Sequence, residues 1–104
     1  MFFKKRPKLN SPMEQFLHRD ELGVDERAVL DVYMTGVAHA LTGVNAVHGA
    51  NGKLPIYHKE GQHPSLEARE LEGIVADFLR ERPDMKRFAL GLVAVQAVLQ
   101  RYKI

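Results

Sequence analysis

The chain has 104 residues, 45% of them hydrophobic, a length that suits one packed domain and not two. It contains no cysteine, which excludes a disulfide framework, a thiolate nucleophile and every cysteine-ligated zinc or iron-sulfur site. There is no uninterrupted apolar run long enough to span a bilayer, and the N-terminus lacks the apolar core of a secretory signal. We therefore expect a cytoplasmic chain that does not associate with a membrane.

The formal net charge of +2 is unevenly distributed along the chain. Four of the 15 basic residues lie within residues 1–10, at Lys4, Lys5, Arg6 and Lys8. The rest of the chain carries 11 basic and 13 acidic residues, a net charge of −2. We interpret residues 1–10 as a flexible basic arm and residues 11–104 as a single helical domain.

A first, short helix is predicted from the run Ser11-Pro12-Met13-Glu14. A capping serine, a proline at the first helical position and a glutamate three residues after the serine are typical of a helix N-terminus. Gly23 stands where a left-handed terminating residue is expected. This helix should therefore end before Gly23.

A second helix is predicted after Asp25, because apolar residues recur at helical spacing from Val29 to Val44. Gly36 falls on this stripe, and we interpret it as a position where another helix approaches closely. Residues 48–64 then contain three glycines and two prolines, which predicts a long loop. Loops of this length are often functional, and we expect Leu54-Pro55-Ile56-Tyr57 to pin the middle of the loop to the core.

A third helix is predicted to begin at a Ser65 cap and to end at Pro83, and Asp84 is predicted to cap a fourth. The fourth helix is apolar nearly all round. Such a helix is either wrapped centrally by the others or has a second apolar face in an oligomer, so a homodimer is expected as well. The predicted core comprises Val32, Tyr33, Val37, Leu41, Ile74, Val75, Phe78, Leu92, Val95 and Leu99.

The predicted fold class is therefore all-α, a compact four-helix domain with a long loop between helices 2 and 3. No catalytic apparatus is evident, because Ser11 and Ser65 are both explained as caps and the threonines lie within a predicted helix. His58, Glu60 and His63 could offer three ligands, but their spacing matches no established zinc pattern. We expect neither an enzyme nor a bound metal or cofactor.

Several segments together resemble the type VI secretion amidase immunity proteins. Residues 30–41, LDVYMTGVAHAL, are similar to the family's C-x-G-Y-x-x-G-V-x-D-A segment. Residues 54–58 and 65–79 are similar to its P-x-Y-C motif and the capped helix that follows. The closing residues 97–104 resemble its A-L-x-x-x-Y-P-C ending. The match runs in order over about residues 13–104, although the family's cysteines would fall near Leu30, His58 and Ile104 in this cysteine-free chain.

The resemblance implies a non-enzymatic protein that binds and blocks a peptidoglycan-cleaving amidase toxin through its helices and a protruding loop. These relatives act in the periplasm, so a chain without an export signal would have a different, cytosolic partner or an upstream gene start. Carried over by position, the 48–63 loop is the predicted contact surface. Its candidate partner-binding residues are Asn51, Lys53, Tyr57, His58, Lys59, Glu60 and His63.

Two alternatives to protein binding remain open from the sequence. One is a structural helical domain. The other is a small nucleic-acid-binding protein, in which the basic arm and Lys86, Arg87, Arg101 and Lys103 would contact phosphates. We consider nucleic acid the less favoured partner. Binding through phosphate contacts would weaken steeply with salt, whereas a shape-complementary protein interface need not.

Overall fold

The computed structural model describes residues 11–59 and 65–104; the predicted arm, residues 1–10, lies outside them, as do residues 60–64. Within those ranges the chain is helical, without strands, and the predicted all-α four-helix fold is confirmed. The α-helices are α1 (Pro12–Leu17), α2 (Val24–Ala50), α3 (Ala68–Glu81) and α4 (Leu90–Arg101). Two 3₁₀ helices, η1 (Arg19–Glu21) and η2 (Pro83–Arg87), precede α2 and α4.

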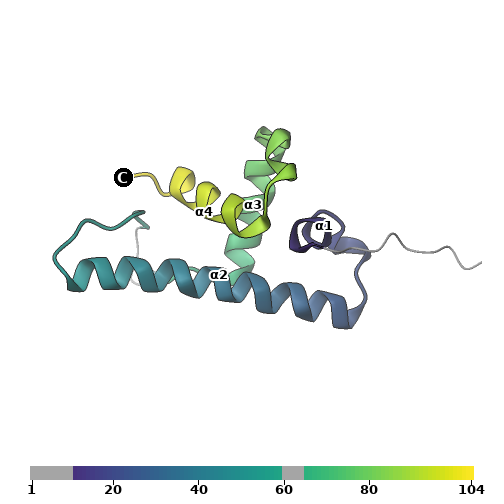
Figure 1. Cartoon of the computed structure of the whole chain (residues 1–104), viewed down its shortest axis with the longest axis horizontal. Coiled ribbons are helices and arrows are strands. Elements are labelled where there is room, and N and C mark those ends of the chain that lie inside the picture. Colours follow the sequence, from purple (N-terminus) through teal and green to yellow (C-terminus); the bar gives the residue numbers. More distant parts are fainter. Residues whose placement is uncertain (1–10, 60–64) are drawn as a thin grey trace, which may run out of the picture.

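The 27-residue helix α2 forms one edge of the molecule, and the other three helices lie on a single side of it (Figure 1). Helix α4 packs against α1, α2 and α3, and α3 also packs against α2. The covered side of α2 therefore contributes to the core, whereas none of the described helices lies against its opposite side (Figure 1).

The start of α1 follows the sequence prediction, but its end does not. The Ser11 hydroxyl accepts a hydrogen bond from the backbone N–H of Glu14 at 3.2 Å, as a capping serine should. Helix α1 ends at Leu17 and η1 follows. Gly23 is extended, at φ −70° and ψ 172°, and caps the N-terminus of α2, so its predicted role as a left-handed terminator is wrong.

The predicted cap of the third helix is also wrong, since α3 begins three residues after Ser65. The intervening Leu66 is 2% exposed, and its backbone N–H donates to the Thr42 hydroxyl of α2 at 2.9 Å. These contacts hold the segment against α2 before the helix starts. The position of the cap is thus set by a tertiary contact and not by the local Ser65 signal.

Asp84 does not cap α4, because it lies inside η2. The chain becomes extended at Phe88, and α4 starts at Leu90 with Ala89 as its N-cap residue. Met85 within η2 is buried, at 9% exposure. Burial of this side chain ties the 3₁₀ segment to the core and delays the start of α4.

The side of α2 that faces the core matches the predicted side only in part. Its buried residues are Leu30, Met34, Ala38 and Leu41, whereas Val32 is 73% exposed. Leu41 agrees with the prediction, Val32 contradicts it, and Tyr33 and Val37 lie partly buried at the edge of the core. Both sides of α2 carry apolar residues at helical spacing, so the pattern cannot identify the buried side.

In helix α4, too, the buried side matches the prediction only in part. Leu92, predicted to be buried, is 52% exposed, and Val95 and Leu99 are partly buried. The buried residues of α4 are instead Leu90, Val93, Ala94, Ala97 and Val98. In α3 the predicted core residues Ile74, Val75 and Phe78 are all buried.

Within one chain, no described helix approaches Gly36 closely. A Cβ at this exposed glycine would meet nothing within 4 Å. Close approach occurs at Gly91 in α4, where a Cβ would lie 2.9 Å from the Tyr33 hydroxyl of α2. Among the helices that the structure describes, none is both long and apolar enough to cross a membrane.

Candidate partner-binding loop

The connection between α2 and α3 begins with a tight turn. The backbone N–H of Lys53 donates to the carbonyl oxygen of His48 at 2.8 Å. Gly52 has a φ of 68°, in the left-handed region that glycine adopts without strain. From this turn the chain folds back alongside α2 toward the C-terminal end of α4 (Figure 1).

Asn45 of α2 holds the returning segment through both ends of its side-chain amide. Its Oδ1 accepts from the backbone N–H of Ile56 at 2.9 Å and from that of Tyr57 at 3.4 Å. Its Nδ2 donates to the carbonyl oxygen of Tyr57 at 2.9 Å. One side chain therefore satisfies three backbone groups of a segment that has no helix or strand to satisfy them.

Tyr57 is part of the core, with 1% exposure, so its assignment as a partner-binding residue is wrong. Its ring lies 6.2 Å from that of Tyr102, between centroids, in a tilted arrangement. The Tyr57 hydroxyl has no hydrogen-bond partner among residues 11–59 and 65–104. The side chain anchors the loop and could reach a partner only if the domain opened.

A polar cluster fastens the far end of the described loop segment. The Glu70 carboxylate of α3 accepts from Lys59 Nζ at 2.6 Å and from the Tyr102 hydroxyl at 2.5 Å. Lys59 also donates to the carbonyl oxygen of Ser65 at 2.9 Å, and the His58 backbone N–H donates to that of Tyr102 at 2.8 Å. The Lys59 ammonium is thus held by contacts within the domain, and a partner could bind it only by breaking them.

The cluster shifts the ionisation of two of its members. Partial burial alone would raise the pKa of Glu70, but the hydrogen bonds from Lys59 and Tyr102 outweigh it, and the pKa is lowered. Burial and the hydrogen bond to Glu70 raise the pKa of Tyr102. At neutral pH the cluster therefore holds an ionised carboxylate and a neutral phenol.

Within the described part of the 48–63 loop, the exposed residues are those of its tip together with His58. Asn51 and Lys53 are exposed, in agreement with a contact role. Leu54, expected to pin the loop, is instead 80% exposed. Glu60 and His63, the remaining candidates, lie outside the described residues. An exposed leucine beside a lysine is the feature that the sequence prediction missed.

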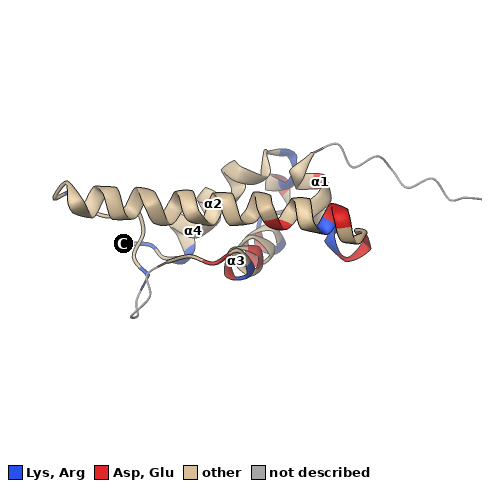
Figure 2. Ribbon diagram, turned by 90° about the horizontal axis from the view of Figure 1, so that it is seen from below, with Lys and Arg blue, Asp and Glu red and all other residues tan. Residues whose placement is uncertain are grey.

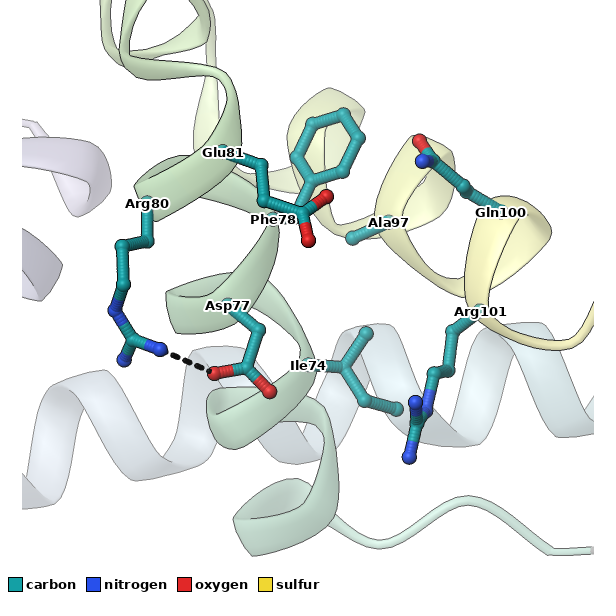
Figure 3. Close-up of a pocket in the computed structure, with 8 residues that line it drawn as sticks. All are labelled: Ile74, Asp77, Phe78, Arg80, Glu81, Ala97, Gln100 and Arg101. Carbon is teal, nitrogen blue, oxygen red and sulfur yellow. Dashed lines mark hydrogen bonds and ion pairs between the residues drawn. The ribbon is translucent and has the colours of Figure 1, made fainter.

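Two pockets lie beside the loop and the helices. A pocket of about 340 Å³ lies between the loop and α2, lined by residues that include Ala46, Pro55 and His58. A second, of about 490 Å³, lies between α3 and α4 (Figure 3). Its lining combines apolar Ile74, Phe78 and Ala97 with charged side chains, among them Asp77 and Arg80, which form an ion pair at 3.0 Å.

The four basic residues of the described part that were considered for nucleic-acid binding do not form one patch. Lys86 and Arg87 belong to η2, before α4, whereas Arg101 and Lys103 lie at its other end. A helix of this length separates them by roughly 18 Å. The Arg87 guanidinium also stacks over the Phe88 ring, 4.9 Å from its centroid. In the part of the chain that the structure describes, no three His, Asp or Glu side chains are grouped so as to hold a metal ion.

Comparison with known protein families, with curated proteins and with solved structures finds no match to this chain. The resemblance to amidase immunity proteins therefore stays a prediction.

Proposed function

We propose that the chain is a non-enzymatic protein-binding module that docks a protein partner through the tip of the loop after α2. The docking residues are Asn51, Lys53, Leu54 and His58. The observation that carries the proposal is the 80% exposure of Leu54 at the tip of the loop. The backbone on either side of Leu54 is held by hydrogen bonds, from Lys53 to His48 and from Ile56 to Asn45.

The anchoring of the loop supports binding with little ordering cost. Asn45, Tyr57 and Lys59 fix the loop on α2, α4 and α3, respectively. A loop that is already ordered loses little conformational entropy when a partner binds. An apolar side chain with a cationic neighbour, here Leu54 with Lys53, suits a partner surface that offers an apolar depression near acidic groups.

The resemblance to amidase immunity proteins suggests a class of partner. An immunity-like role would make the partner a toxin or effector enzyme, inhibited when the loop tip occupies its substrate cleft. Loops carried on a rigid scaffold are common carriers of such contacts.

Affinity capture from the native cell tests the docking surface with two matched variants. Leu54→Asp places a charge at the loop tip, and Val24→Asp places the same charge at an 88% exposed position at the start of α2. We expect Leu54→Asp to lose a partner that the wild type and Val24→Asp both retain. The captured partner is then purified and its affinity measured against all three chains by calorimetry.

Equal affinity of the wild type and folded Leu54→Asp would remove the loop tip as the docking site. Capture of nucleic acid in place of protein, with binding that weakens steeply as salt rises, would contradict the partner class. Circular dichroism of each variant establishes that the fold is intact.

A further inference from the structure

The side of α2 that faces away from the other helices is apolar along most of its length. Figure 2 views the molecule from this side, with α2 in front. The exposed residues recur at steps of three and four, with Gly43 and Val44 adjacent, which places them on one side of the helix. We call them the α2 stripe: Val29, Val32, Gly36, Ala40, Gly43, Val44 and Val47.

The stripe carries no charge. Residues 32–52 contain no Asp, Glu, Lys or Arg, and α2 is correspondingly uncoloured in Figure 2 from its middle to its C-terminal end. Val32 is 73% exposed and Val47 58%. A solvent-facing helix surface normally carries polar and charged residues, so an uncharged face of this length indicates a surface that is covered in the working protein.

The stripe is shaped to receive a helix. Its middle consists of the small residues Gly36, Ala40 and Gly43, and a Cβ at either glycine would meet nothing within 4 Å. Valines flank this shallow middle on both sides. Small residues at a contact allow two helix backbones to approach closely, while flanking branched side chains fill the space on either side.

Six of the seven stripe residues are arranged symmetrically about position 38; Gly43 has no counterpart, because position 33 is the partly buried Tyr33. Val29 and Val47 lie nine residues to either side, Val32 and Val44 six, and Gly36 and Ala40 two. A second copy of the same helix, running antiparallel, would therefore set valine against valine at the ends and small residue against small residue in the middle. Self-complementarity of this kind is what a two-fold interface requires.

The charges at the two ends favour the same antiparallel direction. Asp25 lies in the first turn of α2 and Lys53 just after its last, and both are exposed. Neither side chain forms an ion pair within residues 11–59 and 65–104. Antiparallel pairing places Asp25 of each chain near Lys53 of the other, whereas parallel pairing would bring like charges together.

We propose that the chain forms a two-fold homodimer in which the α2 stripes of two copies pack antiparallel, centred on position 38. The stripe is about 27 Å long. With these exposed fractions it offers on the order of 500 Å² per chain, so a dimer buries on the order of 1,000 Å², the lower bound for a specific interface. A reversible dimer is therefore expected, one that dissociates at micromolar concentrations.

Sedimentation of the full chain between about 5 and 500 µM tests the proposal, because a reversible dimer shifts with concentration over such a range. Gly36→Lys places a cation in the middle of the stripe, and we expect it to raise the dissociation constant at least about tenfold. The matched control is Gly73→Lys in α3, an exposed helical glycine whose Cβ also meets nothing within 4 Å. This control should dimerise like the wild type.

Mixing two variants tests the antiparallel register. Ala40→Glu alone should weaken the dimer in the same way. An equimolar mixture of Gly36→Lys and Ala40→Glu should regain the dimer, because position 36 of one chain faces position 40 of the other. Circular dichroism confirms that each variant is folded.

A wild type that stays monomeric throughout, or a Gly36→Lys variant that dimerises like the wild type, overturns the proposal. Failure of the mixture to recover overturns the antiparallel pairing. A monomer that floats with phosphatidylcholine vesicles, and loses this property on Gly36→Lys substitution, would assign the stripe to a lipid surface instead.

Discussion

The Asn45 side chain offers a direct test of how the loop is held. We expect Asn45→Ala to destabilise the domain and to free the loop, because the amide makes three hydrogen bonds to the backbone of Ile56 and Tyr57. Alanine removes all three and offers the freed backbone groups no replacement. Its higher helix propensity recovers only a few tenths of a kcal/mol.

The magnitude follows from the geometry of these bonds. Two of them are 2.9 Å long and contribute about 1 kcal/mol each, while the third, at 3.4 Å, contributes less. The groups are partly buried, so water can satisfy some of them after the substitution. The expected loss in the free energy of unfolding is therefore about 1.5 to 2.5 kcal/mol.

Urea unfolding measures this loss, and amide hydrogen exchange locates it. The Ile56 and Tyr57 amides should lose protection in Asn45→Ala, while amides in α3 keep theirs. Asn51→Ala is the matched control, because Asn51 is exposed at the end of α2. A change below about 0.5 kcal/mol, with Ile56 and Tyr57 still protected, would refute the reasoning.

Two further predictions concern the core and the polar cluster. Phe78→Ala should cost about 3 to 5 kcal/mol by urea unfolding because Phe78 is 7% exposed, whereas Phe88→Ala, at 38% exposure, should cost far less; equal losses would contradict this account of the core. Glu70 has a folded-state pKa below its ordinary value of 4.5, so its ionised form adds stability above that pH, and this contribution is lost as pH falls through the lowered pKa. Stability measured by urea unfolding from about pH 5 to pH 3 should therefore fall less steeply in Glu70→Gln than in the wild type, and parallel pH profiles would contradict the prediction.

The sequence predicts which segments are helical better than it predicts which side of each helix is buried. Helix α3 has one apolar side, and its core residues Ile74, Val75 and Phe78 were correctly predicted. Helices α2 and α4 have apolar residues on two sides, so the spacing fits either choice, and Val32 and Leu92 were wrongly assigned. Only packing against the other helices decides between the two sides.

The ends of helices depend on contacts from outside the helix. Ser65 and Asp84 are good local cap signals, yet α3 starts only after the buried Leu66, and α4 only after η2. Both starts are set by side chains that reach the core. A local capping preference of about 1 kcal/mol is too small to outweigh such burial.

The sequence predicts the connection between α2 and α3 as a loop, but it does not distinguish the residues that anchor this loop from those that are exposed. Tyr57 and Lys59 are anchors, and Leu54 is exposed, the reverse of what the polarity of these side chains suggests. The residue that organises the loop is Asn45, which the sequence shows only as an asparagine within an apolar helix. A side-chain amide in such a position can both donate and accept hydrogen bonds, and it is the feature of the sequence from which a loop folded back on the helix could have been predicted.

The anchoring by Asn45 also bears on how the domain acquires its structure. Asn45 and Ile56 are only 11 residues apart, and a loop of that size closes in roughly 10 to 100 ns. The bond between Glu70 and Tyr102 spans 32 residues and must wait until α3 and α4 meet. The hydrogen bonds from Asn45 to the loop can thus form early in folding, before α3 and α4 pack together. The contact between the Tyr57 and Tyr102 rings forms later, when α4 docks.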